Sequence, residues 1–193
     1  MGFKVVDVPS LKLPQGVEVL MQTYEKQELP DGVIVMKNNI FPDDWGGTFK
    51  EMVRLDEEGC VMALKEQKID FKIRQVSMSI LPPRKKMFWH LHPDRNGKPG
   101  QKEMWIVNSM LLMGMYDLRK DSPTCGMKTK IILTPDKIVY FPLGICHGAY
   151  NPTDAVSTLV YFMDRQFEPT DDTQECRIDP DKLSYDFIAP DVI

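Results

Sequence analysis

The three histidines of this 193-residue chain are the residues whose types and spacing most directly suggest chemistry. His90 and His92 form an H-x-H pair, and alternate residues of a β-strand point to the same face of a sheet. His147 follows a Pro-Leu-Gly segment at 142–144, which predicts a tight turn that directs this third imidazole inward. We therefore expect His90, His92 and His147 to share one pocket.

A carboxylate completes a potential set of metal ligands. Glu103 follows the H-x-H pair after an insertion rich in glycine, proline and charge, and residues 142–151 match P-x-G-x-x-H-x-x-x-N. These two segments resemble the sequence motifs of the cupin superfamily, which implies an all-β jelly-roll barrel. Three imidazoles and one carboxylate are a ligand set for a divalent transition metal such as Fe, Mn, Ni or Zn. We expect a metal bound by His90, His92, Glu103 and His147, and no organic cofactor.

Short β-type runs separated by turn residues must position these side chains, and such runs predict a sandwich or barrel. The sequence indicates one domain over 1–193, with an N-terminal arm over about 1–30 and a C-terminal wrapping segment over about 164–193. One candidate helix lies at 18–26. The expected strands cover residues 33–36, 48–55, 60–64, 71–81, 87–92, 104–116, 128–133, 137–141 and 157–162.

The composition limits the classes of partner. The chain is 42% hydrophobic and 27% charged, which is ordinary for a globular protein. Its net charge of -4 and its single short basic cluster at 84–86 do not indicate a nucleic-acid partner. No apolar stretch approaches the roughly 20 residues that span a bilayer. The four cysteines form no C-x-x-C pair, so we expect reduced thiols in a cytoplasmic protein.

The most specific sequence pattern lies at 117–126. Its D-L-R-K-D-S-P-T-C-G resembles the D-L-R-x-x-S-P-T-x-G of the dTDP-4-dehydrorhamnose 3,5-epimerase family, whose members are metal-independent cupins. Weaker similarity at 44–51, 177–180 and 183–187 extends the resemblance over roughly residues 30 to 190. The resemblance implies a homodimer with exchanged N-terminal strands and proton transfer next to a keto group. It also implies that His92 is the general base, Lys102 stabilises the oxyanion and Tyr161 is the general acid.

Two arginines that hold the nucleotide-sugar in this family are replaced, by Trp89 and Gly46. Neither replacement offers the bidentate charged fork of an arginine. We expect Arg84, Lys85 or Arg119 to supply the missing charge.

Lys102 and Glu103 are neighbours, so on a strand only one of them can face the pocket. Counting back from Asp117 places Lys102 at the lysine of the epimerase family, whereas the pattern E-x-W-x-V of metal-binding cupins places Glu103 inside. A carboxylate would complete a metal's shell and an ammonium would oppose it. We favour Glu103; a degenerate site without any ligand is the alternative.

Three functions remain open. The first is an isomerase of the sugar-epimerase type, which acts on a keto-sugar or related small carbohydrate by proton transfer next to a carbonyl, with or without a metal. The second is a cupin oxygenase dependent on Fe or Mn. The third is a non-catalytic sugar-binding cupin in which Trp45 and Trp89 offer stacking surfaces, while Trp105 packs in the core.

Overall fold

The computed structural model describes residues 2–23, 28–167, 176–179 and 182–183. Almost all regular structure in this part of the chain is β-strand, and the one helix is α1 (Met62–Lys65). The strands are β1 (Gly2–Val6), β2 (Val19–Thr23), β3 (Ile34–Lys37), β4 (Ile40–Pro42), β5 (Thr48–Lys50), β6 (Gln75–Leu81), β7 (Lys86–Leu91), β8 (Glu103–Val107), β9 (Leu111–Asp117), β10 (Lys128–Leu133), β11 (Lys137–Phe141), β12 (Ile145–Tyr150), β13 (Ser157–Met163) and β14 (Cys176–Arg177).

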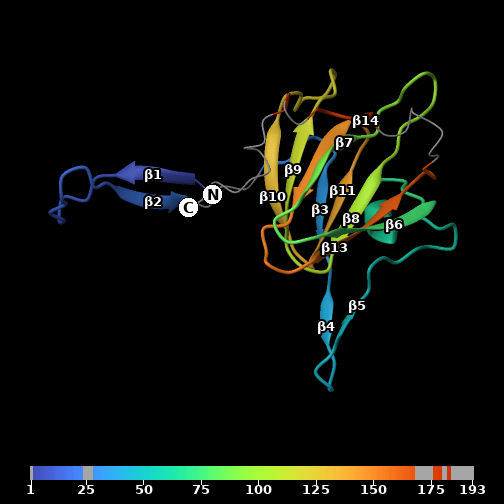
Figure 1. Cartoon of the computed structure of the whole chain (residues 1–193), viewed down its shortest axis with the longest axis horizontal. Helices are drawn as coiled ribbons and strands as arrows, with labels where there is room; N and C mark the ends of the chain where they lie inside the picture. The colour runs from blue at the N-terminus through green and yellow to red at the C-terminus, as the bar shows by residue number, and fades with distance from the viewer. Residues whose placement is uncertain (1, 24–27, 168–175, 180–181, 184–193) are drawn as a thin grey trace.

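Two five-stranded antiparallel sheets form the barrel (Figure 1). One has the order β10-β9-β12-β7-β14 and the other the order β3-β11-β8-β13-β6. Apart from β9 and β10, strands that are neighbours in these two sheets are not consecutive in sequence, as in a jelly roll. The predicted all-β cupin barrel is therefore confirmed.

Three local predictions are wrong. The strand expected over 104–116 is two strands, β8 and β9, with residues 108–110 between them. In the candidate helix at 18–26, Val19–Thr23 form β2, which pairs with β1 in the register Val6↔Val19 to Gly2↔Thr23, and residues 24–26 lie outside the described residues. Residues 60–64 were expected to form a strand, but helix α1 begins at Met62, and Leu64 packs in a buried cluster with Phe71. The segments at 18–26 and 60–64 are too short for periodicity alone to separate helix from strand.

The alternation of side chains across the strands separates an inner core from an outer one. Met113 and Met115 of β9 face the barrel interior together with Trp105 of β8, and all three are almost completely buried. Trp89 of β7 and Cys146 of β12 face the opposite side of their sheet and form a separate cluster. His90 and His147, which directly follow Trp89 and Cys146 in sequence, therefore point into the barrel.

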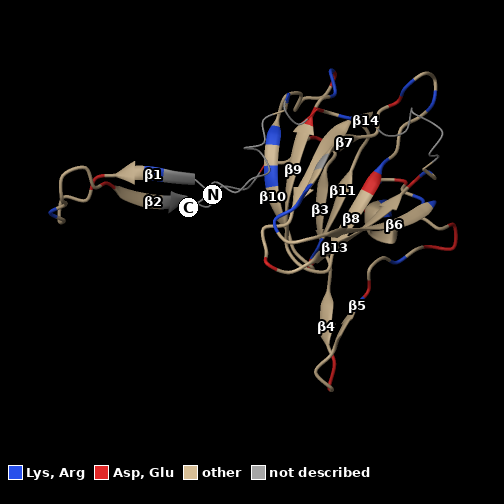
Figure 2. Cartoon of the chain, viewed as in Figure 1, with Lys and Arg blue, Asp and Glu red and all other residues tan. Residues whose placement is uncertain are grey.

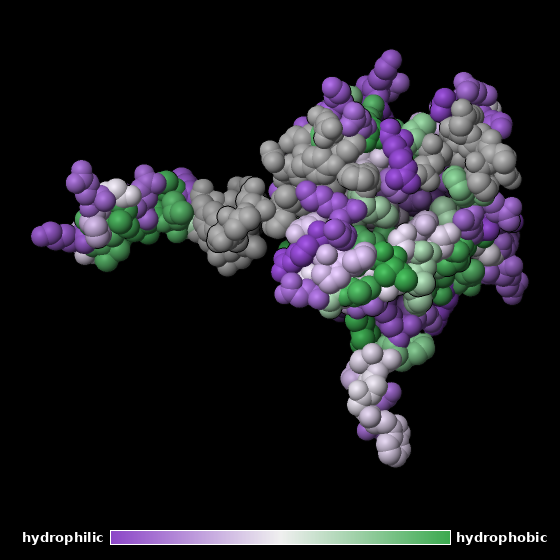
Figure 3. All heavy atoms as spheres, viewed as in Figure 1, coloured by the Kyte–Doolittle hydropathy of each residue, from purple (hydrophilic) through white to green (hydrophobic). Residues whose placement is uncertain are grey.

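Two hairpins lie apart from the barrel. Figure 1 shows the β1–β2 hairpin on one side and the β4–β5 hairpin projecting from the bottom. Apolar residues cover part of the first hairpin (Figure 3), where Val5 and Leu20 are more than half exposed. Within the described residues no helix is long and apolar enough to cross a membrane.

Candidate active site

A cavity of about 530 Å³ opens between the two sheets. Strand β7 of the first sheet contributes His90, and His92 follows at its end; β6, β8 and β13 of the second sheet contribute the facing wall. Charged residues lie mainly in loops and at strand ends (Figure 2). Glu103, the first residue of β8, differs from most of them because it is only 4% exposed. This buried carboxylate therefore sits at the wall of the cavity.

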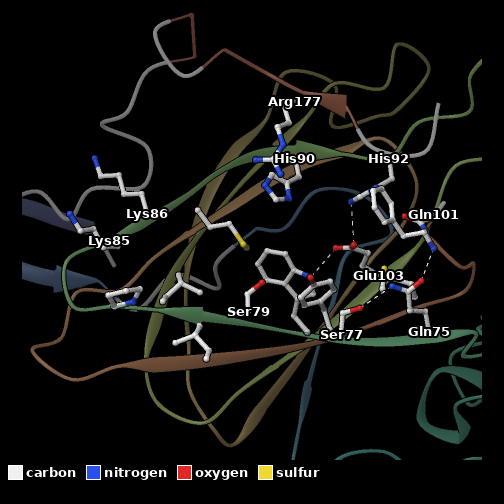
Figure 4. A pocket seen from close by; sticks show the side chains of 18 residues that line it. Gln75, Ser77, Ser79, Lys85, Lys86, His90, His92, Gln101, Glu103 and Arg177 are labelled. Carbon is white, nitrogen blue, oxygen red and sulfur yellow. Dashed lines mark hydrogen bonds and ion pairs between the residues drawn. The ribbon is translucent and has the colours of Figure 1, made fainter. Parts of the chain in front are cut away.

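Glu103 lies between two imidazoles. Its Oε1 is 3.2 Å from His92 Nε2, a contact visible in Figure 4, and its Oε2 is 3.1 Å from His147 Nε2. Trp105 Nε1 donates a hydrogen bond of 2.9 Å to Oε2. Burial by itself would raise the pKa of Glu103, but the contacts with His147 and His92 outweigh it and lower the pKa well below its usual range. Glu103 is therefore ionised at neutral pH.

The ring of His147 is held on several sides. Its Nδ1 lies 2.9 Å from the carbonyl oxygen of Ile145, which can only accept, so Nδ1 carries a proton. The ring stacks on Phe141 at a centroid distance of 4.8 Å and meets the edge of Trp105 at 4.9 Å. The turn before β12 brings the histidine here, because Gly144 adopts a φ of +78°. The predicted inward turn is thus present.

His90 lies directly opposite His147 on the adjacent strand, with ring centroids 6.3 Å apart. It lines the cavity, but of the four predicted metal ligands only His92, Glu103 and His147 have ligand atoms within 4.8 Å of one another. Burial, with help from His147 and Arg177, lowers the pKa of His90 to about 3, so this imidazole is neutral. The structure thus brings together three of the four residues predicted as metal ligands.

Tyr161 enters the cavity from the other sheet. It lies on β13, pairs with Trp105 on β8 and with Ser77 on β6, and is half-buried. His92 and Tyr161 therefore line one cavity from facing sheets. This arrangement offers a potential base and a potential acid on the two sides of a bound ligand.

Lys102 lies outside this cavity. Its Nζ is 3.4 Å from the carbonyl oxygen of Asp70 and 4.0 Å from a carboxylate oxygen of Asp164. From this segment Gln101, Glu103 and Trp105 line the cavity, so Lys102 falls on the alternate side of the chain. The expectation that Lys102 acts in the pocket is wrong for this reason, and Glu103 is the inward residue, as we favoured.

The two tryptophans expected to stack on a sugar are elsewhere. Trp89 is fully buried on the outer face of β7, in a cluster with Cys146 and Leu183. Trp45 is 96% exposed at the end of the β4–β5 hairpin, outside the cavity. Trp105 is in the core, as expected, and it also donates to Glu103.

Two of the three cationic residues expected in the pocket, Arg84 and Arg119, lie outside the cavity. Arg84 forms an exposed ion pair with Asp154 at 2.8 Å and does not line the cavity. Arg119 is held by Asp117 at 2.8 Å, in the loop after β9. The cations that do line the cavity are Lys85, Lys86 and Arg177, of which only Lys85 was expected.

Sequence reasoning also missed a polar wall. Gln75, Ser77 and Ser79 of β6 alternate along the strand and all line the cavity (Figure 4). Their period of two was readable in the sequence, since alternate strand residues share a face. The signal for Arg177 was its place in the recognised segment at 177–180.

The sequence pattern most specific to the family builds a loop. Asp117 is fully buried and accepts hydrogen bonds from Arg119, from Ser122 Oγ at 2.5 Å and from Thr124 Oγ1 at 2.6 Å. Burial by itself would raise the pKa of Asp117, but these donors outweigh it and lower the pKa well below the ordinary value. The pattern at 117–126 is therefore structural.

Comparisons with known proteins agree with this architecture. ChmJ, a 3'-monoepimerase from Streptomyces bikiniensis crystallised with dTDP-quinovose, is 23% identical, with a TM-score of 0.68 over 88% of this chain and 80% of that chain. The dTDP-4-dehydrorhamnose 3,5-epimerase from Sulfolobus tokodaii is 24% identical, with a TM-score of 0.65 over 84% and 85%. The Legionella pneumophila RmlC, in complex with dTDP-4-keto-L-rhamnose, is 20% identical, with a TM-score of 0.63 over 79% and 75%.

No curated protein matches the chain. The sequence model of dTDP-4-dehydrorhamnose 3,5-epimerase matches residues 26–190, which is most of the chain. This match confirms the predicted isomerase class, an epimerase that acts on a keto-sugar by proton transfer. The chain belongs to the dTDP-4-dehydrorhamnose 3,5-epimerase family.

Proposed function

We propose that the substrate is a nucleotide-linked 4-keto sugar, which the protein epimerises at a carbon next to the carbonyl. The observation that carries this proposal is the placement of His92 and Tyr161 on facing sheets of one cavity. Epimerisation removes a proton from one face of the carbon and returns one to the other face, so it needs two groups on opposite sides. His92 is the base in this proposal and Tyr161 is the acid.

Glu103 would support the base. Its carboxylate lies 3.2 Å from His92 Nε2 and orients the ring, as a carboxylate does beside a catalytic imidazole. The epimerase family's partner of the base histidine is an aspartate, for which the sequence offers no clear counterpart. In this chain the buried Glu103 can take that part.

The positive charge at one end of the cavity supports a substrate with an anionic end. Figure 4 shows Lys85 and Lys86 at one end of the cavity and His92 with Glu103 at the other. A diphosphate at the lysine end would leave the keto-sugar beside His92, since ammonium groups bind phosphate oxygens well. Relatives of similar fold were crystallised with dTDP-quinovose and dTDP-4-keto-L-rhamnose, which fits a substrate with an anionic diphosphate and a sugar.

The test is incubation with dTDP-4-keto-L-rhamnose in D₂O, followed by NMR of the sugar protons. The wild type should incorporate deuterium next to the carbonyl and form the epimer. Tyr161→Phe should still exchange the proton but return it to the original face, whereas His92→Ala should do neither. The proposal is refuted if the wild type leaves the sugar unchanged, or if His92→Ala exchanges at the wild-type rate.

We further propose a homodimer. Val5 and Leu20 of the β1–β2 hairpin are more than half exposed, and β6, at the end of its sheet, exposes Val76, Met78 and Ile80 by 57–62%. A second copy can cover such apolar surface. Light scattering should give twice the chain mass, and Met78→Glu should lower the measured mass. A monomeric wild type would refute the proposal.

The four free cysteines support a cytoplasmic location.

A further inference from the structure

We infer that His90 is a further catalytic residue, whose imidazole donates a hydrogen bond to the carbonyl oxygen of the bound keto-sugar. When His92 takes the neighbouring proton, the C–H electron pair forms a C=C bond and the carbonyl becomes an enolate, whose oxygen carries the negative charge. Tyr161 then gives a proton to the opposite face of the carbon, and both side chains regain their starting protonation by exchange with water. The inference rests on the proposed function and adds the group that stabilises the enolate.

The first observation is where the cations of the cavity lie. Among the described lining residues the cations are the lysines at 85 and 86 and Arg177, and Figure 4 shows the lysines at the other end of the cavity from His92. Lys102, to which the family resemblance assigned the oxyanion, lies outside the cavity. The inward residue is Glu103, which is ionised. An enolate oxygen formed near this carboxylate therefore needs another hydrogen-bond donor.

His90 is placed to reach that oxygen. It lies on β7, His92 directly follows that strand, and both imidazoles line the cavity. At about 3.3 Å per residue, their Cα atoms are roughly 7 Å apart. A donor and a base, each about 3 Å from its own substrate atom, fit this separation. The reason is that the reacting carbon and the carbonyl oxygen are separated by only one carbon atom.

The hydrogen-bonding capacity of His90 is unused in the protein alone. Its Nε2 is buried and has no hydrogen-bond partner among the described residues. His92 and His147, in contrast, each face Glu103, at 3.2 and 3.1 Å. Because buried polar groups are normally paired, an unpaired one in a cavity calls for a partner from a ligand. A carbonyl oxygen bound beside the ring would be that partner.

The surroundings of His90 suit a neutral donor. Burial lowers the pKa of the ring, and His147 and Arg177 lower it further, so the ring stays neutral. A neutral imidazole carries one N–H and can polarise a carbonyl oxygen in an enolising enzyme. Arg177 lies opposite His90 on β14, and its positive charge makes that N–H a stronger donor. Arg177 itself is exposed, so water screens its direct effect on the oxyanion.

The test is the rate of epimer formation from dTDP-4-keto-L-rhamnose, followed by NMR. His90→Leu keeps an apolar side chain in place of the ring and removes the donor, whereas His90→Gln keeps an N–H. His90→Leu should lower kcat by roughly 100-fold to 1000-fold, the cost of losing one oxyanion donor, and leave KM nearly unchanged. His90→Gln should recover part of the lost kcat. Lys102→Ala is the matched control and should keep the wild-type kcat, because Lys102 lies outside the cavity.

Binding of dTDP-quinovose separates stabilisation of the oxyanion from a role in holding the sugar. This ligand has a hydroxyl where the keto-sugar has its carbonyl, so it cannot form an enolate. Calorimetry should show that His90→Leu binds dTDP-quinovose nearly as tightly as the wild type does. A loss of affinity as large as the loss of kcat would overturn the inference, because His90 would then act on the ground state.

Circular dichroism should show that each variant is folded before its kcat is compared. If His90→Leu does not fold, His90→Ala takes its place, and imidazole added to the medium should restore part of the lost kcat. Such recovery is expected only if the ring supplies a chemical group, and not if it merely supports the strand.

Three kinetic results would also overturn the inference and leave the proposed function standing. They are a wild-type kcat without the His90 ring, a loss that neither glutamine nor added imidazole recovers, and an equally large loss in Lys102→Ala. A wild type that exchanges no sugar proton would refute both the proposed function and the inference.

Discussion

Replacing Asp117 by asparagine should destabilise the protein strongly, although the residue lies outside the cavity. Asp117 is completely buried, and its carboxylate accepts from Arg119 Nε at 2.9 Å, Arg119 Nη2 at 2.8 Å and the hydroxyls of Ser122 and Thr124. Asparagine keeps the volume but loses the charge and turns an amide toward these donors.

The size of the effect follows from these contacts. Removing one partner of a buried ion pair costs about 3–5 kcal/mol, and the side chain of Arg119 is 25% exposed, which favours the lower value of about 3 kcal/mol. For a protein of this size that corresponds to a Tm lower by roughly 6–12 °C. Urea unfolding at fixed protein concentration, followed by tryptophan fluorescence, measures the free energy of unfolding.

The effect should depend on pH in one direction. Since the folded-state pKa of Asp117 is lowered, its contribution is complete above the unfolded-state pKa of about 4 and is lost as the pH falls through the folded-state pKa. The difference between wild type and Asp117→Asn should therefore shrink below pH 4. Asp154→Asn is the matched control, because Asp154 pairs with Arg84 at the surface and its side chain is 89% exposed. Equal losses in the two variants, or a difference that persists unchanged at low pH, would refute the reasoning.

Other predictions concern Lys102 and Trp89, which the structure places outside the cavity, and Gly144, which lies in the turn before β12. Lys102→Ala should leave the KM for the sugar nucleotide unaltered, because Lys102 lies outside the cavity; a large increase would contradict this placement. Trp89→Ala should lower the free energy of unfolding by about 3–5 kcal/mol, measured in urea, and leave ligand affinity unchanged in the folded protein. Gly144→Ala should lower the Tm more than Gly16→Ala. Both glycines have a positive φ, but only at 144 would the new Cβ lie 2.7 Å from Arg119 Cγ.

Much of the site could be predicted because strand geometry is local. An H-x-H pair on a strand places both imidazoles on one face, and His90 and His92 both line the cavity. The turn at 142–144 is likewise local, since Gly144 supplies the positive φ that aims His147 inward. The family and the barrel could be recognised from the same short segments.

The sequence by itself indicated the histidine pocket, because strand alternation and turn chemistry act within a few residues. Its short motifs indicated the class of fold and the family through their resemblance to those of known proteins. Only the tertiary structure decided that Glu103 faces inward while Lys102 and Trp89 do not, and that Lys85 and Arg177 line the cavity instead of Arg84 and Arg119. The physical reason is that the face of a strand that becomes the interior depends on how β7, β8 and β14 pair with strands distant in sequence.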